Sequence, residues 1–223
     1  LLFWAFRQTG DSTFYNIAVN HARTTIKNHF REDFGTYHVI DYDTNTGQVL
    51  KRNTHQGYAD ESTWSRGQGW AIYGYTMCYC ETGLPEFLLQ AKRSADYFFN
   101  NPNLPDDLLP YWDFNAPEIP NEPRDVSAAT VTASALYELS MYDTADGALH
   151  LERANKMLDN LTAYYRPEPG SARGFLLLHS TGSKAHSSEV DVPLVYADYY
   201  FLEALLRKQR LEQTGSIFVP GNE

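Results

Sequence analysis

The chain repeats one pattern, which is a helix, a tight turn and a second helix. Thr9-Gly10 and Thr82-Gly83 each separate two segments whose apolar residues recur at helical spacing, and Pro85 follows the second turn, where a helix can begin. A looser copy of the turn lies at 142–146. The first helices of these pairs are expected at 1–8, about 62–81 and about 127–141. The repeated unit is therefore predicted to be a helix hairpin, and the fold class to be all-α.

Long connections separate the hairpins, at 32–60, 102–124 and 167–189. Loops of this length in a globular domain are usually functional. Paired helices with long loops at alternate junctions predict a single toroidal domain over residues 1–223, in which inner helices surround an axis and the loops gather at one end. A helical solenoid is the alternative arrangement.

Short strands and one last helix complete the prediction. Within the first loop, β-favouring runs at 36–43 and 48–52 flank Thr44-Asn45-Thr46-Gly47, which indicates a small β-hairpin. A further short strand is expected at 174–179. A final helix is expected from Val192 to about Gln209, packed through its aromatic side.

Composition limits the partners of the chain. Its 18 Lys and Arg against 28 Asp and Glu give a net charge of −10, which argues against nucleic acid as a partner. No uncharged apolar stretch of about 18 residues is present, so no membrane-spanning segment is expected. Aromatic residues make up 14% of the chain, a share that suits both sugar stacking and a large helical core. No nucleophile elbow, phosphate loop or metal-ligand motif is found, so no cofactor or metal is expected.

The densest polar and aromatic segment runs from Thr54 to Trp70. Asp60 or Ser62 can cap a helix in which Arg66 and Trp70, four residues apart, lie on one face. A guanidinium beside an indole at a helix start suits the carboxylate and the flat ring of a sugar acid. The same pair also fits a structural role, with the arginine bonded to loop carbonyls and the tryptophan in the core.

Other polar residues near this segment also fit either role. His38 in the predicted hairpin, and His55 and Gln56 ahead of the helix, suit hydrogen bonds to substrate hydroxyls or to the backbone of a loop. Several carboxylates on loops and helix starts are placed where a general acid could act, but capping and solvation explain them as well. They are Asp41, Asp43, Asp60, Glu61, Asp106, Asp107 and Asp113.

Three segments carry a resemblance to a known family. They are Thr54–Trp70, with its Arg66-Gly67-Gln68-Gly69-Trp70 run, then Pro110–Phe114 with Pro123-Arg124-Asp125, and finally Asp198–Leu205. Together they resemble glycoside hydrolase family 88, the unsaturated glucuronyl hydrolases, over nearly the whole chain. A related family that acts on unsaturated rhamnogalacturonan products shares the fold, but the Arg-Gly-Gln-Gly-Trp run resembles family 88 more closely.

The resemblance implies an (α/α)6 barrel and an enzyme that removes the 4,5-unsaturated uronic acid from the non-reducing end of oligosaccharides left by polysaccharide lyases. In that family an aspartate protonates the C4–C5 double bond, water adds at C5, and the hemiketal collapses to release the sugar. By motif, Arg66 and Trp70 would contact the uronate with Thr54 nearby, while His38 and Gln56 would orient the sugar and the water.

The same resemblance places the family's catalytic aspartates ahead of Leu1, so no residue of this chain is expected to be the catalytic acid. The run from Leu1 to Phe6 is apolar and uncapped, which indicates a start inside a helix of a longer protein. We therefore expect a C-terminal portion of the barrel that is inactive alone. Its open ring would expose apolar helix faces, and it would aggregate or recruit the missing N-terminal portion. The family's role suggests a periplasmic location.

Two other functions fit the residues. A non-catalytic helical carbohydrate-binding protein would use Arg66 to bind saturated and unsaturated uronides alike. A complete enzyme of another (α/α) toroid family would use Asp60 or Asp113. The sulfation preference of the substrate is open, because the segment from His179 to Lys184 only loosely resembles the Ser- and Lys-containing segment that family members acting on sulfated disaccharides use.

Overall fold

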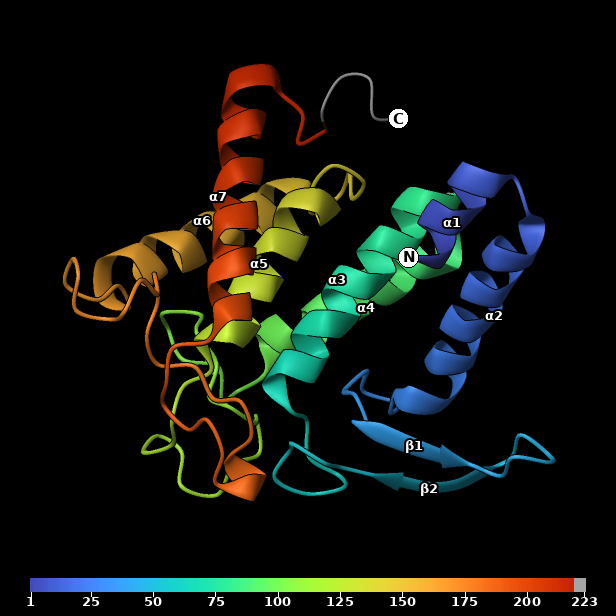
Figure 1. Ribbon diagram of the computed structural model, residues 1–223, viewed down its shortest axis with the longest axis horizontal. Helices are drawn as coiled ribbons and strands as arrows, with labels where there is room; N and C mark the ends of the chain where they lie inside the picture. Colours follow the sequence, from blue (N-terminus) through green and yellow to red (C-terminus); the bar gives the residue numbers. More distant parts are fainter. Residues whose placement is uncertain (219–223) are drawn as a thin grey trace.

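Seven α-helices and one two-stranded sheet make up residues 1–218, which the computed structural model describes. The elements are α1 (Leu2–Thr9), α2 (Ser12–His29), β1 (Val39–Tyr42), β2 (Val49–Asn53), α3 (Ser65–Thr82), α4 (Pro85–Asn100), α5 (Val126–Leu139), α6 (Gly147–Tyr164), a short 3-10 helix (Lys184–His186) and α7 (Val195–Thr214). The helices pair as α1/α2, α3/α4 and α5/α6 (Figure 1). The three predicted helix hairpins and the antiparallel β-hairpin are confirmed.

The tight turns follow the chemistry that the sequence indicates. Gly10 and Gly83 end α1 and α3 in the left-handed region, with φ of 71° and 65°, which glycine adopts without steric cost. Asp11 caps α2 by accepting a hydrogen bond from the Thr13 amide at 2.9 Å, and Pro85 stands in the first turn of α4.

Two local predictions are wrong. Neither Asp60 nor Ser62 caps α3, which begins at Ser65 without a side-chain cap. Asp60 instead accepts from the Thr54 amide, and the Ser62 hydroxyl donates to Asp113 at 2.7 Å, because loop groups from elsewhere in the fold compete for both side chains. The expected strand at 174–179 is irregular backbone, and an isolated bridge between Ser180 and Val192 lies just after it.

The core is built around α5. Every residue of α5 is buried, because α3 and α7 flank it and α6 covers it (Figure 1). The outer helix α4 covers α3 in the same way. We call α1, α3, α5 and α7 the inner helices and α2, α4 and α6 the outer helices, since the chain alternates between the two sets. This alternation is the one expected for part of a toroid.

The last helix differs from its prediction at its start and on one face. It begins at Val195, three residues later than expected, and Phe201 is buried. Tyr199, however, is 59% exposed, so the aromatic side of α7 is only partly packed. Among residues 1–218, none of the helices combines the length and apolar character needed to cross a membrane.

Candidate functional site

The candidate residues gather at the end of the molecule where the inner helices α3, α5 and α7 begin. The β-hairpin and the loops that precede α5 and α7 lie at this same end (Figure 1). Helix amino termini carry partial positive charge and free amide donors, so several of them at one end favour anionic groups there. A site for an anionic group is therefore expected among the loops at this end, which are 30–64, 101–125 and 166–194.

Arg66 is almost entirely buried in the first turn of α3, with 3% of its surface exposed. Its Nη1 donates to Asp125 Oδ2 at 2.5 Å and to the Thr181 carbonyl at 2.8 Å. Its Nη2 donates to the Gly182 carbonyl, also at 2.8 Å. The guanidinium lies 4.5 Å from the centre of the Trp64 ring. Arg66 therefore joins α3, α5 and the 179–194 loop from within.

Asp125 compensates the charge of Arg66. It is fully buried, and its Oδ1 accepts from the Ser127 amide at 3.1 Å and the Ser127 hydroxyl at 2.6 Å, which caps α5. The Thr181 amide also reaches Oδ1, at 3.3 Å. A buried ion pair persists only when further hydrogen bonds satisfy both partners, and this one is so supported.

Gln56 reaches the same loop from the other side. Its Nε2 donates to the Gly182 carbonyl at 2.8 Å, so Gln56 and Arg66 share one acceptor. The backbone amide of Gln56 donates to His38 Nδ1 at 3.1 Å, as does the amide of His55. The Thr54 hydroxyl accepts from the Gly57 amide and lies 3.4 Å from His38 Nδ1.

Burial keeps His38 neutral, and its hydrogen bonds decide which ring nitrogen carries the proton. Burial lowers the pKa of His38 to about 4, and the nearby His55 and Arg66 act in the same direction. The ring is therefore neutral at pH 7. Because Nδ1 accepts two amide hydrogens, the ring proton lies on Nε2, which makes His38 a hydrogen-bond donor at that atom. Its ring centre is 4.5 Å from that of Trp64.

A cavity of about 450 Å³ lies beside this cluster, between α2 and α3. His38 and Trp70 both line it, together with Trp64 and Tyr37. Aromatic rings and a few polar groups around a space of this size are typical of a site for a small molecule, and flat rings suit the apolar face of a sugar. The Trp70 ring also contacts Tyr200 of α7, with centres 5.2 Å apart.

The structure thus brings four of the five predicted residues into one network and places the fifth beside it. His38, Thr54, Gln56 and Arg66 are linked by the contacts above, and Trp70 shares the cavity with His38. Four acceptors already surround the Arg66 Nη atoms, the fourth being the Ser127 hydroxyl at 3.0 Å. Direct contact of Arg66 with a sugar carboxylate stays a prediction.

Two of the carboxylates considered as general acids, Asp113 and Asp60, have structural partners. Asp113 is fully buried and accepts from the Tyr58 amide at 2.9 Å, the Ser62 hydroxyl at 2.7 Å and the Asn115 amide at 2.8 Å. Burial is the main cause that raises its pKa. Asp60 is exposed and binds the Thr54 amide. Neither residue lines the cavity beside His38.

Several residues around this site have little or no signal in the sequence. Asp125 is detectable as a helix cap followed by Ser127, although nothing in the sequence indicates that it meets Arg66. The Gly182 carbonyl leaves no signal, because a backbone acceptor is not specified by residue type. Lys184 forms an ion pair with the buried carboxylate of Glu122, which also accepts from Trp112 Nε1 at 2.9 Å. Over the range 1–218, no three His, Cys, Asp or Glu side chains lie close enough together to hold a metal ion.

Comparison with known proteins identifies the family. No family model matches the chain. Over 212 residues the chain is 49% identical to an unsaturated glucuronyl hydrolase of Formosa agariphila, a match that covers 95% of this chain and 52% of that protein. The chain is a homologue of the unsaturated glucuronyl hydrolases of glycoside hydrolase family 88. It is also 36% identical over 215 residues to an unsaturated chondroitin disaccharide hydrolase of Streptococcus agalactiae, covering 93% of this chain and 52% of that one.

A solved structure agrees with this assignment. The crystal structure of an unsaturated glucuronyl hydrolase specific for heparin matches with a TM-score of 0.93 at 45% identity, over 95% of this chain and 57% of that chain. The expected fold class is confirmed, since the helices and the hairpin correspond to about half of the family's (α/α)6 barrel. The chain therefore spans about half the length of the relatives it matches.

Proposed function

We propose that this chain belongs to an enzyme that removes a 4,5-unsaturated uronic acid from the non-reducing end of lyase-generated oligosaccharides. The observation that carries the proposal is the aromatic cavity lined by His38 and Trp70, in a homologue of unsaturated glucuronyl hydrolases. Structures of two such hydrolases contain bound unsaturated oligosaccharides, dGlcA-Glc-Rha-Glc and dGlcA-GalNAc6S. The relatives are named for glucuronyl, chondroitin and heparin substrates, so the class of linkage is shared while the glycan differs.

The reaction is a hydration of a vinyl ether. A proton adds to C4, water adds to C5, and the resulting hemiketal opens to release the rest of the sugar chain. Trp70 provides a flat surface for the ring, and the Nε2 hydrogen of His38 is a donor for a sugar oxygen or for the attacking water. Because His38 is neutral, it orients rather than supplies the proton. Gln56 and Arg66 hold the 179–194 loop against the site through Gly182.

The proton donor in this proposal lies outside the chain. Family 88 enzymes use an aspartate for this step, and the motif resemblance places it ahead of Leu1. Asp113 is a poor substitute because three donors already surround its carboxylate. The chain would then supply one wall of the substrate pocket, and the rest of the barrel would supply the acid.

The test compares the chain with a hybrid in which it is joined to the part of the Formosa agariphila relative that it does not match. Hydration destroys the double bond, so turnover is followed as loss of the ultraviolet absorbance of an unsaturated disaccharide. We expect turnover by the hybrid and none by the chain alone. Turnover by the chain alone would refute the placement of the acid, and an inactive but folded hybrid that binds the disaccharide would refute the proposed reaction.

A non-catalytic uronide-binding protein is the second candidate. The observation in its favour is that none of the residues lining the cavity beside His38 is an aspartate or glutamate. Such a protein would bind saturated and unsaturated disaccharides with similar affinity. The hybrid protein would then leave the ultraviolet absorbance of the unsaturated disaccharide unchanged. Titration calorimetry with both disaccharides separates the two functions.

A further inference from the structure

A separate cavity, of about 520 Å³, lies beside the C-terminal end of the outer helix α4. Within residues 1–218 it shares no lining residue with the cavity beside His38. Four asparagines, two aspartates, one arginine and one proline line it, together with the aromatic rings of Phe34 and Tyr97. We call it the α4 cavity. Its wall combines flat rings with many hydrogen-bonding groups, which suits a polar organic molecule.

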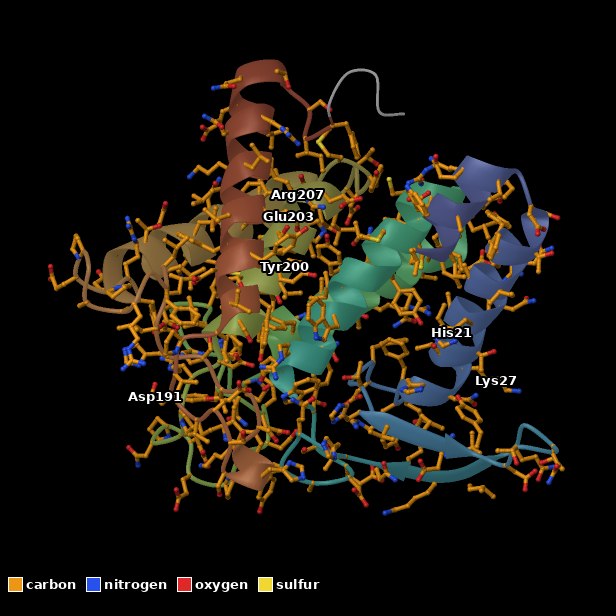
Figure 2. All side chains as sticks on the ribbon, in the orientation of Figure 1. His21, Lys27, Asp191, Tyr200, Glu203 and Arg207 are labelled. Atoms are coloured by element: carbon orange, nitrogen blue, oxygen red, sulfur yellow. The ribbon has the colours of Figure 1, made fainter. Side chains whose placement is uncertain are left out.

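Polar side chains elsewhere in the helix layer are already paired. Figure 2 shows Tyr200, Glu203 and Arg207 on the side of α7 that faces α3. Glu203 accepts there from the Tyr73 hydroxyl at 3.1 Å, and Arg207 donates to Glu138 at 2.7 Å. These groups bond protein to protein, so their presence is explained by the fold.

The α4 side of the α4 cavity differs in this respect. Arg93, Asp96 and Asn100 follow one another at spacings of three and four residues, so they lie on one face of the helix. All three are exposed, and within residues 1–218 none of their side chains forms a hydrogen bond or an ion pair. A guanidinium, a carboxylate and an amide therefore line one wall with their hydrogen-bonding capacity unused.

The end of α4 adds acceptors to this wall. At the end of α3 the Gly83 amide bonds back to the Tyr79 carbonyl at 2.7 Å, but Asn101 after α4 is extended, with φ −67° and ψ 125°. The last carbonyls of a helix have no partner within it. Because Asn100 and Asn101 both line the α4 cavity, these carbonyls lie beside it.

Phe34 holds a backbone conformation that is rare for an aromatic residue. Its φ of 68° lies in the left-handed region, which costs free energy for any residue with a Cβ. Gln68 Nε2 fixes the turn by donating to the Phe34 carbonyl at 3.1 Å. The ring lies outside the hydrophobic core of the described residues, and the Arg93 guanidinium is 4.7 Å from its centre. A strained residue whose ring adds little to the core indicates a functional constraint.

The chemistry of the wall suits a neutral sugar. A pyranose has an apolar face that stacks on a flat surface, and hydroxyls that donate hydrogen bonds to carboxylates, amide oxygens and helix carbonyls. Two carboxylates against one guanidinium, together with the negative end of α4, disfavour an anionic sugar. A metal ion does not fit, since no group of three His, Cys, Asp or Glu side chains among residues 1–218 could hold one.

We propose that the α4 cavity is a non-catalytic binding site for a neutral hexose unit of a glycan. The sugar stacks on the flat surface formed by Phe34 and Arg93, and its hydroxyls bond to Asp96 and Asn100. The site holds a glycan outside the cavity beside His38. The proposal does not rest on the proposed reaction, because its test measures binding of a saccharide that contains no unsaturated uronic acid.

The experiment titrates the chain with neutral tetrasaccharides of glucose, galactose or mannose and follows its amide signals by nuclear magnetic resonance. We expect at least one to bind with a Kd of about 1 mM and to shift signals at 33–35 and at the end of α4. Salt should change this Kd by less than about twofold, because the ligand is uncharged. Arg93→Gln and Asn100→Ala should each weaken binding by about tenfold. The matched control is Arg23→Gln, which also removes one exposed charge from an outer helix and should bind like the parent.

Replacing Phe34 separates a binding role from a structural one. Phe34→Gly removes the ring and also relieves the left-handed backbone. We therefore expect binding to be lost while the urea midpoint stays the same or rises. Phe34→Ala should lose binding equally but have a lower midpoint than Phe34→Gly, because its Cβ keeps the strain. A midpoint of Phe34→Gly below that of the parent would show that the ring serves stability and would overturn the proposal.

Three further results would overturn it. The first is that none of the tetrasaccharides binds at about 50 mM, which is about fifty times the expected Kd. The second is binding that Arg93→Gln leaves unchanged or that Arg23→Gln weakens equally. The third is displacement by excess unsaturated disaccharide, which would place the sugar in the cavity beside His38. Circular dichroism checks that each variant keeps its helices. A folded hybrid without turnover would count against the proposed reaction but not against this site.

Discussion

Gln56 and Arg66 donate to the same acceptor, the carbonyl oxygen of Gly182, each over 2.8 Å. One side chain comes from the loop before α3 and the other from the first turn of α3, yet the acceptor is more than 110 residues away in the sequence. Because a carbonyl has two lone pairs, it can satisfy both donors. This shared contact fixes the 179–194 loop over the site, and it gives Arg66 a structural task beside any contact with substrate.

Replacing Arg66 tests that task. Arg66→Ala would leave the fully buried carboxylate of Asp125 without its counter-charge, and we expect a loss of about 3–5 kcal/mol in the free energy of unfolding. The control is Arg23→Ala, which removes an exposed ion pair with Glu86 and should cost about 0.5 kcal/mol or less. Urea denaturation measures both variants. Equal costs would show that the buried pair is not what holds the loop.

Gly182 itself gives a second test. A Cβ at this position would lie 2.7 Å from the Cβ of Glu189, so Gly182→Ala forces the loop to shift and should cost about 1–3 kcal/mol. Hydrogen exchange should quicken at the paired amides of Ser180 and Val192, which bond each other's carbonyls at 2.9 Å. Gly74→Ala in α3 is the control, because nothing lies within 4 Å of its Cβ, and it should leave this exchange unchanged. Unchanged exchange in Gly182→Ala would contradict the argument.

The free energy of unfolding at acidic pH tests the protonation state of His38. Burial lowers the pKa of His38 to about 4 in the folded chain, whereas an unfolded histidine titrates near 6.5. Between these values the unfolded state binds more protons, so stability falls as pH drops from about 6.5 to 4. The ring is partly exposed, so we expect its share of this loss to be about 1–2 kcal/mol, less than the whole shift implies.

A variant isolates this contribution. His38→Gln removes the titrating ring and should flatten the pH dependence of the unfolding free energy between pH 4 and 6.5. His21→Gln, on the exposed side of α2, is the control and should leave the slope as it is. Nuclear magnetic resonance of the His38 ring should show no titration between pH 5 and 8. A His38 that gains a proton near pH 6.5 would refute the neutral donor on which the proposed role depends.

How far the sequence predicts this molecule depends on the range of each interaction. The hairpins follow from local signals, since glycine at 10 and 83 ends a helix whatever surrounds it. The start of α3 was missed because the side chains of Asp60 and Ser62 bond to Thr54 and Asp113 and not to the helix. Local helix propensity does not include such hydrogen bonds to groups outside the helix.

The candidate site shows the same division. Residue type and spacing single out Arg66 and Trp70, and the structure places both at one end of α3, with only Trp70 in the wall of the cavity. The sequence does not reveal the partners of Arg66, because two of them are the backbone carbonyls of Thr181 and Gly182, and residue type does not specify a backbone acceptor. The protonation state of His38 depends likewise on two amides that the chain folds onto it.

Asp113 separates a structural carboxylate from a catalytic one. Its two oxygens accept from the Tyr58 amide, the Ser62 hydroxyl and the Asn115 amide, so both are already engaged. In Asp113→Asn one oxygen becomes an NH2 group that faces a donor in either orientation of the amide. At least one of these three donors then loses its acceptor, and we expect a cost of about 1–3 kcal/mol in the free energy of unfolding. Turnover per folded molecule of the hybrid should change by less than about twofold, because the carboxylate takes no part in proton transfer.

Asp106→Asn, at an exposed position in the loop before α5, is the control and should change neither the free energy of unfolding nor the turnover. A fall of about 100-fold in turnover by Asp113→Asn, with stability and disaccharide binding retained, would make Asp113 the acid and would favour the alternative of a complete enzyme of another (α/α) toroid family.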